Sequence, residues 1–182
     1  MKKLLLIIAC VLSFTTLFAQ NSTKYYVYGI DFSHAKVFAA EESVEQFSNA
    51  FQAINLLLVT EAEKYDFYEL IGRRPKVVID PMMKLLADCD YADLKTYEKD
   101  FPEIDYAACV NNYQLPQTEG VGVIMIAKLL DKPLACAYYT LIKFDIATRE
   151  IISQDDVLGK ARGFGLRNYW AGSVYQVIKS GK

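Results

Sequence analysis

A glycine-rich stretch near the end of the chain carries the residues best suited to binding an anion. Gly159–Gly165 reads GKARGFG and precedes a sequence with helical periodicity. Backbone N–H groups in such a loop, together with the N-terminus of the following helix, attract negative charge. The candidate ligand- or partner-binding residues are Lys160, Arg162, Gly163, Gly165, Arg167 and Asn168.

The same stretch has an alternative, purely structural interpretation. Its glycine spacing matches neither a Walker A loop nor the dinucleotide-binding fingerprint. A tight turn from a strand into a helix also uses glycines, because glycine adopts positive φ without a steric penalty. Both interpretations stay open at the level of sequence.

His34 is the only histidine, so any Ser–His–acid catalytic system would have to use it. Asp31 and Ser33 are close in sequence, but no nucleophile-elbow pattern follows a strand. We interpret His34 as a polar residue at the end of a strand and assign no catalytic residue. The sequence favours a non-enzymatic role, with carboxylate or tyrosine catalysis as a third alternative.

Three carboxylates surround Cys89 in the segment Asp88–Asp93. Oxygen ligands suit Ca²⁺, but this segment lacks the turn glycine and the closing glutamate of an EF-hand loop. We interpret it as a solvated acidic loop and predict no metal site and no cofactor. Beyond residues 1–19 the cysteine count is odd, which gives no complete disulfide framework. Cys109 and Cys136 lie in apolar runs and are expected to be buried thiols.

Residues 1–19 have the pattern of a secretory signal peptide. Lys2 and Lys3 precede the apolar run Leu4–Phe18, and Ala19 then precedes polar residues. The run is shorter than the roughly 20 residues that a bilayer span needs, which disfavours a membrane anchor.

Cleavage after Ala19 would leave residues 20–182, a length typical of one domain. We expect an exported protein that is periplasmic or associated with the outer envelope and does not span the membrane. Lipidation at Cys10 is a minor alternative, because the apolar run continues past it.

The composition allows a sizeable core and argues against nucleic acid as a partner. Apolar residues make up 53% of the chain, the formal net charge is −2, and there is no Lys/Arg-rich run. An aromatic face for a protein partner is one interpretation of the tyrosines, and packing with a solvated hydroxyl is the other. These tyrosines are Tyr25, Tyr26, Tyr28, Tyr138 and Tyr139.

Hydrophobic periodicity predicts the order strand, helix, strand, weak helix, three strands, helix. The predicted strands are Lys24–Phe32, Lys76–Asp80, Val121–Leu130, Leu134–Asp145 and Glu150–Leu158. The predicted helices are Ser43–Glu63, Glu103–Leu115 and Leu166–Ile178. Ser43 and Gln46 fit a capping box at the start of the first helix. The apolar stripe of that helix is Phe47, Phe51, Ile54, Leu58 and Ala62, and the residues of the last helix expected to pack inward are Leu166, Trp170, Val174 and Val177. In the first strand, Tyr26, Tyr28, Ile30 and Phe32 should share one face. Pro81 should interrupt the apolar run after the second strand.

The fold class that follows is α/β (α+β). We predict a mixed sheet of about five strands with a C-terminal antiparallel meander, because short turns separate the last three strands. A long N-terminal helix and a C-terminal helix should cover this sheet.

Two motifs carry a resemblance to a known group of proteins. FDIATREI at Phe144–Ile151 and GKARGFGLRNYWAGSVYQVIK at Gly159–Lys179 resemble a family of uncharacterised exported proteins of Bacteroides-type bacteria. That family shares an FDI-TR turn and a terminal GFG-RNYW motif, and it implies no catalytic residue. The order of elements is also similar to the small α/β domain of curli-secretion and TolB-type envelope proteins, which bears on fold more than on function.

These observations favour an exported, non-enzymatic envelope module that binds a partner, associates with itself or helps assembly. The alternative is a protein that binds a small molecule or an anion through Gly159–Asn168. A deep pocket lined by paired carboxylates would favour an enzyme, and a flat exposed aromatic patch or a dimer seam would favour the partner-binding module.

Overall fold

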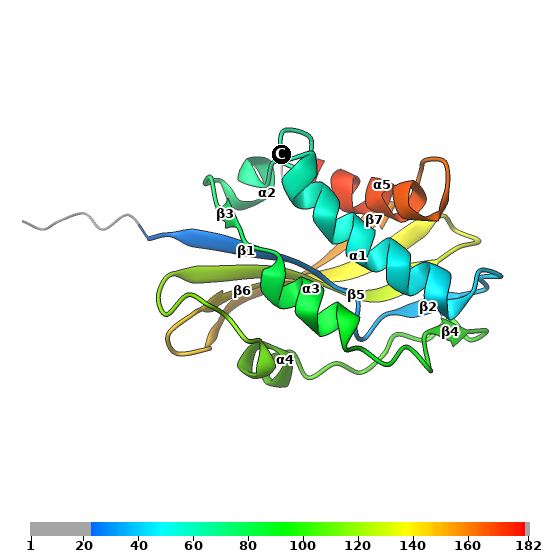
Figure 1. The fold of residues 1–182 in the computed structure, drawn as a ribbon, viewed down its shortest axis with the longest axis horizontal. Helices are drawn as coiled ribbons and strands as arrows, with labels where there is room; N and C mark the ends of the chain where they lie inside the picture. The colour runs from blue at the N-terminus through cyan, green and yellow to red at the C-terminus, as the bar shows by residue number, and fades with distance from the viewer. Residues whose placement is uncertain (1–22, 181–182) are drawn as a thin grey trace, which may run out of the picture.

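The computed structural model describes residues 23–180. The predicted signal peptide and Cys10 lie outside these residues, so export, lipidation and the domain boundary stay predictions. The strands are β1 (Tyr25–Asp31), β2 (Lys36–Phe38), β3 (Lys76–Val77), β4 (Lys95–Thr96), β5 (Val121–Asp131), β6 (Cys136–Asp145) and β7 (Ile151–Lys160). The helices are α1 (Val44–Thr60), α2 (Tyr68–Ile71), α3 (Asp80–Ala87), α4 (Tyr106–Asn112) and α5 (Leu166–Lys179) (Figure 1).

β5 is the axis of the sheet. One of its edges pairs in parallel with β1 over Val121–Ile126 and with β2 over Leu129–Asp131, so β1 and β2 lie end to end. The short strands β3 and β4 add in parallel to β1 and β2. The other edge of β5 pairs antiparallel with β6, which pairs antiparallel with β7.

The two faces of the sheet are covered differently. Helices α1, α3 and α5 form a layer on one face (Figure 1). The segment between β4 and β5, which contains α4, crosses the other face. Neighbouring residues of β6 show this division, because adjacent strand residues point to opposite faces. The Tyr139 hydroxyl hydrogen-bonds with Ser173 of α5, and Thr140 hydrogen-bonds with Tyr106 of α4.

The long helix α1 forms as its sequence predicts. Ser43 and Gln46 make reciprocal hydrogen bonds, so the predicted capping box is confirmed. The apolar stripe predicted for this helix is buried against the sheet and includes Phe47, Phe51 and Leu58. None of the helices in residues 23–180 combines the length and apolar character needed to cross a bilayer.

The predicted architecture is wrong in several respects. The sheet contains seven strands rather than about five, and the path β3-β1-β5-β2-β4 is parallel throughout. Residues 23–180 contain five helices, so a cover of one N-terminal and one C-terminal helix is also wrong. Nothing in the sequence indicated β4, because a strand of two residues has no readable periodicity.

Pro81 explains one of these errors. The predicted strand Lys76–Asp80 is reduced to Lys76–Val77, and helix α3 begins at Asp80. Pro81 occupies the first turn of α3, where its missing N–H has no intrahelical acceptor to lose and its fixed φ suits the helix. The proline therefore starts an element rather than interrupting one.

A β-bulge in β1 is held by a buried asparagine. The register with β5 shifts between Val27 and Gly29, and Gly29 has φ 111°. Asn55 of α1 is fully buried, accepts a hydrogen bond from the Ile30 N–H at 2.8 Å and donates to the Ile30 carbonyl at 2.9 Å. A Cβ at Gly29 would overlap the Asn55 side-chain oxygen, so both residue types are required.

The bulge reverses the faces of the residues that follow it. Tyr28 hydrogen-bonds to Gln117 in the segment after α4, whereas Phe32 stacks on Phe51 of α1 at 4.1 Å between ring centroids. The prediction that Tyr28 and Phe32 share one face is therefore wrong. Asp31 is directed to the α4 side, where it accepts a hydrogen bond from the residue after α4.

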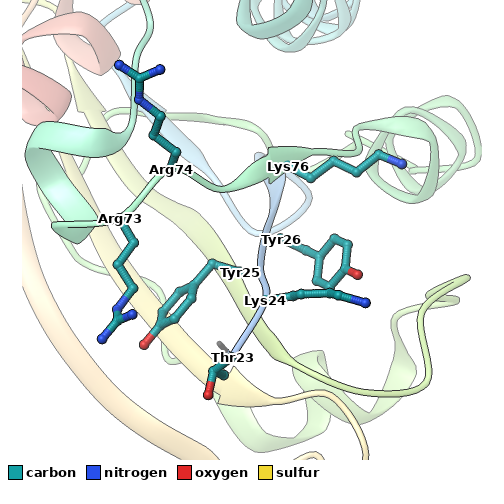
Figure 2. A pocket seen from close by; sticks show the side chains of 7 residues that line it. All are labelled: Thr23, Lys24, Tyr25, Tyr26, Arg73, Arg74 and Lys76. Atoms are coloured by element: carbon teal, nitrogen blue, oxygen red, sulfur yellow. The ribbon is translucent and has the colours of Figure 1, made fainter. Parts of the chain in front are cut away.

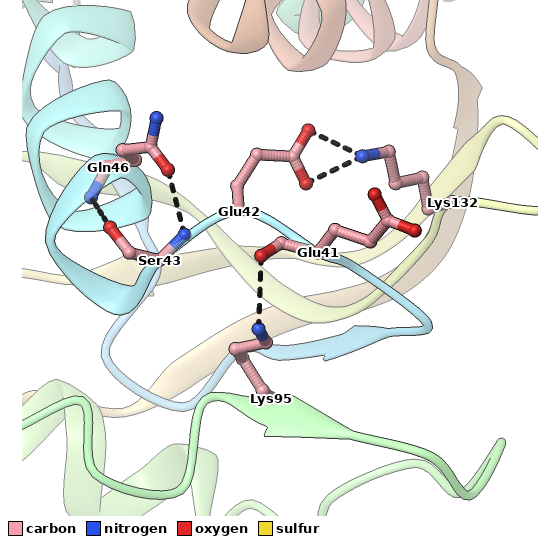
Figure 3. A network of polar contacts seen from close by, with 6 residues as sticks. All are labelled: Glu41, Glu42, Ser43, Gln46, Lys95 and Lys132. Carbon is pink, nitrogen blue, oxygen red and sulfur yellow. Dashed lines mark hydrogen bonds and ion pairs between the residues drawn. The ribbon is translucent and has the colours of Figure 1, made fainter.

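A polar network fastens the start of α1 to two other parts of the sheet (Figure 3). Lys132, in the turn between β5 and β6, bonds both carboxylate oxygens of Glu42. Lys95 of β4 donates to the Glu41 carbonyl at 3.4 Å. Burial acts to raise the pKa of the Glu42 carboxyl, but hydrogen bonds from Lys132 and the backbone hold it below its ordinary value.

Replacing Asn55 tests the bulge. We expect Asn55→Ala to lower the free energy of unfolding by about 3 kcal/mol, because it leaves the buried N–H and carbonyl of Ile30 without partners. Chemical denaturation measures this change. Asn49→Ala is the matched control, since Asn49 is an exposed residue of the same helix. An equal effect of the two substitutions would contradict a special role for Asn55.

The Glu42–Lys132 pair should make stability depend on pH. A carboxyl whose folded pKa is lowered stabilises the fold above its unfolded pKa, and this contribution is lost as the pH falls through the folded pKa. Glu42→Gln should cost less than about 1 kcal/mol at pH 7, and the difference from the unmodified protein should shrink as the pH falls below the unfolded pKa of about 4.3. Chemical denaturation over a series of pH values measures this change. Glu41→Gln, the neighbouring control, should show no such dependence.

Candidate functional site

The stretch singled out from the sequence lines a pocket beside α5. The pocket, here called the α5 pocket, has a volume of about 520 Å³ and lies between α5, the loop before it and the turn that follows α1. The loop contributes Arg162, Gly163 and Phe164, and the turn contributes Glu61, Lys64 and Tyr65.

Glycines bring the loop onto the helix. A Cβ at Gly172 of α5 would overlap the Arg162 carbonyl oxygen, so only glycine permits this approach. The Arg162 N–H then donates to the Tyr169 carbonyl at 3.1 Å. Gly163 has φ 133°, a conformation that side-chain-bearing residues rarely adopt. The structural interpretation of these glycines is therefore correct, and it coexists with a pocket.

The opposite face of α5 anchors the helix. Trp170, Val174 and Val177 are fully buried, as the sequence predicts. With this stripe fixed against the sheet, the residues at Asn168, Gly172 and Tyr175 turn toward the pocket.

Positive charge dominates the lining. Lys64, Arg162, Arg167 and Lys179 all line the pocket, against the single carboxylate of Glu61. Lys64 pairs with Glu61 at 2.8 Å, and Lys179 pairs with Glu69 outside the lining. No carboxylate within residues 23–180 forms an ion pair with Arg162 or Arg167.

Three aromatic rings border these cations. Tyr65 is buried and meets Tyr175 edge to face at 6.2 Å between ring centroids. Burial raises the pKa of Tyr65 above its ordinary value, so its hydroxyl stays protonated and can donate a hydrogen bond. Phe164, at the tip of the loop, is 96% exposed. The pocket therefore offers charge and apolar surface together.

The structure brings together most of the residues predicted from the sequence. Arg162, Gly163, Arg167 and Asn168 line the pocket. Lys160 and Gly165 are outside the lining. Lys160 ends β7, where its backbone N–H donates to Gln176. Gly165 is the N-cap of α5, with φ 79° and no side chain to make a cap hydrogen bond.

The sequence analysis did not predict the pocket residues that lie outside Lys160–Asn168. Tyr175 and Lys179 follow Asn168 and Gly172 at helical spacing, so the α5 periodicity contained a signal for them. Lys64 and Tyr65 carried no such signal, because their proximity depends on how α1 packs against α5.

A second cationic pocket lies near the start of β1. It has a volume of about 450 Å³ and is lined by Thr23, Lys24, Tyr25, Tyr26, Arg73, Arg74 and Lys76. Figure 2 shows that Arg73, Arg74 and Lys76 point in different directions, and only Arg73 lies over the Tyr25 ring, at 5.7 Å. Diverging cations do not hold one small anion, so this is the weaker site.

The acidic segment and the cysteines build no metal centre in the described part of the chain. Within residues 23–180, no group of three or more His, Cys, Asp or Glu side chains is arranged to hold a metal ion. The side chain of Asp90 instead accepts a hydrogen bond from the Ala92 N–H. Cys109 and Cys136 are buried and free, as predicted.

Comparison with protein-family models, curated proteins and solved structures finds no match for this chain. The resemblance to exported proteins of Bacteroides-type bacteria therefore stays a prediction.

The close approach at Gly172 gives a direct test of how the α5 pocket is built. We expect Gly172→Ala to lower the free energy of unfolding by about 1–3 kcal/mol, because overlap with the Arg162 carbonyl outweighs the gain of about 1 kcal/mol in helix propensity. Thermal unfolding followed by circular dichroism measures it. Arg167→Ala, at an exposed position of the same helix, is a control without overlap. Greater stability of the Gly172→Ala variant would contradict the packing described.

Proposed function

We propose that this chain is an exported binding module whose α5 pocket takes a small anionic ligand with an apolar part. The observation that carries the proposal is the charge of the lining, where Arg162 and Arg167 lack an ion-pair partner among residues 23–180. Arginine presents several N–H donors in a plane, which suits carboxylate and phosphate groups.

The aromatic rings define the rest of the ligand. Phe164 exposes almost its whole side chain beside the cations, and Tyr175 is partly exposed. A ligand ring or alkyl chain lying on these side chains would remove their apolar surface from water. An organic phosphate or carboxylate should therefore bind more tightly than inorganic phosphate.

Binding a protein partner of the cell envelope is the second candidate. The exposed Phe164 favours it, because a large apolar side chain at a loop tip is suited to bury in a partner. The two candidates share the loop and differ in whether a small anion alone is sufficient for binding.

Calorimetric titration with phenyl phosphate tests the proposed function. We expect binding that weakens about tenfold or more in the double variant Arg162→Gln/Arg167→Gln, because charge-assisted hydrogen bonds are lost. Inorganic phosphate should bind more weakly than phenyl phosphate. High salt should weaken both interactions, because it screens the cations.

The matched control is Arg73→Gln/Arg74→Gln, which removes the same charge from the second cationic pocket. This variant should bind phenyl phosphate as the unmodified protein does. Equal loss in both double variants, or no binding by the unmodified protein, would contradict an anion site at α5. In the second case, retention of an envelope partner through Phe164 would favour the partner-binding candidate.

A further inference from the structure

A separate pocket lies at the carboxyl end of β1. It has a volume of about 300 Å³ and is lined by Asp31, His34, Asp105, Cys109 and Tyr113, among others. It shares no lining residue with the α5 pocket.

The topology makes this end of β1 a natural place for a site. β1 pairs in parallel with β3 on one side and with β5 on the other. The chain reaches β3 through α1 on one face of the sheet. It returns to β5 through α3 on the same face, then through β4 and α4 (Figure 1). The carboxyl ends of parallel strands are where α/β proteins commonly bind ligands.

The crevice brings a thiol and an imidazole together from distant parts of the chain. Cys109 Sγ of α4 lies 3.3 Å from His34 Nε2, within hydrogen-bonding distance. Cys109 is 8% exposed, and His34 is exposed at the pocket wall. A thiol beside a proton acceptor is the arrangement that activates a nucleophilic cysteine.

A buried carboxylate fixes the two segments that carry this pair. Asp31 is fully buried and accepts hydrogen bonds from the Ser33 N–H at 2.8 Å and the Ser33 hydroxyl at 2.6 Å, next to His34. It also accepts a hydrogen bond from the Tyr113 hydroxyl at 2.6 Å, just beyond the helix of Cys109. Asp31 is therefore a positioning residue for both members of the pair.

The Cys109 thiol keeps its proton before any reaction. Burial, reinforced by the charges of Asp31 and Asp105, raises the pKa of the Cys109 thiol to about 11. A preformed thiolate is thus absent at neutral pH. Nucleophilic attack requires that the imidazole remove the thiol proton as the new bond forms, which is general-base catalysis.

The charge of the pocket limits what can enter it. Asp31, Glu103 and Asp105 line it, and no lysine or arginine does. An anionic substrate would be repelled, whereas a neutral or cationic one would not. This preference is the opposite of that of the α5 pocket.

We propose that Cys109 and His34 form a nucleophilic pair that accepts an acyl group from a neutral or cationic ester or thioester. Cys109 Sγ bonds to the carbonyl carbon of the substrate while His34 Nε2 takes the thiol proton. The bond to the leaving alcohol or thiol then breaks, and His34 returns the proton to that group. Water subsequently attacks the thioester on Cys109, releases the carboxylic acid and restores the thiol.

Reaction with the neutral ester p-nitrophenyl acetate tests this activity. We expect p-nitrophenol release together with an acetyl group on Cys109, located by mass spectrometry of peptides. His34→Gln should slow acetylation of Cys109 by about 100-fold, the usual contribution of a general base. His34 is exposed, so this variant should keep the fold, which circular dichroism verifies.

Two controls distinguish acetylation that depends on His34 from the ordinary reactivity of a protein thiol. Cys89 is a partly buried thiol whose hydrogen bonds go to the carbonyls of Ser33 and Asp90 rather than to an imidazole, so it should be acetylated far more slowly. Arg162→Gln/Arg167→Gln should leave acetylation unchanged, which keeps this result independent of the proposed anion site. Acetylation at equal rates with and without His34, or acetylation of Cys89 in preference to Cys109, would overturn the proposal.

Discussion

The pair of hydrogen bonds between Asn55 and the backbone of Ile30 is the constraint on which the rest of β1 depends. Without a partner, the backbone groups freed by the bulge would be buried and unsatisfied, at a cost of about 1–3 kcal/mol each. With Asn55 in place, the bulge becomes the stable conformation. It turns Phe32 into the helix layer and Asp31 toward α4. One buried amide on α1 thereby decides which side chains each face of the sheet receives.

The bulge also explains why a fully buried carboxylate is tolerated at the end of β1. Asp31 finds three donors there, two from Ser33 and one from Tyr113. Hydrogen bonds of this kind stabilise the charged form of a carboxylate and offset its loss of hydration. The same hydrogen bonds connect the loop after β1, which carries His34, to the chain just after α4, the helix that carries Cys109. The imidazole and the thiol are therefore held close together by hydrogen bonds of their neighbours.

The sequence predicted elements with long, regular patterns and missed those set by tertiary contacts. The α1 stripe and capping box, and the buried face of α5, follow from helical spacing. The prediction that Pro81 interrupts an element was wrong, because a proline in the first turn of a helix is compatible with the helix. The sequence does not show that Pro81 occupies the first turn of α3. The bulge at Gly29 was not predicted, because it depends on an asparagine that is distant in the sequence.

The loop before α5 was predicted as a candidate site because its arginines and glycines are close together in the sequence. The contact between His34 and Cys109 joins residues 75 positions apart, so sequence spacing holds no trace of it.

The small net charge of the chain does not show that positive and negative side chains gather around different pockets. The formal total is only −2, yet cations dominate the α5 pocket and carboxylates dominate the crevice at β1. Electrostatic energies between charges fall with distance and are screened by salt, so each pocket responds mainly to its own lining. An anionic ligand attracted to Arg162 and Arg167 would be repelled by Asp31 and its neighbours. The linings of the two pockets therefore favour molecules of opposite charge.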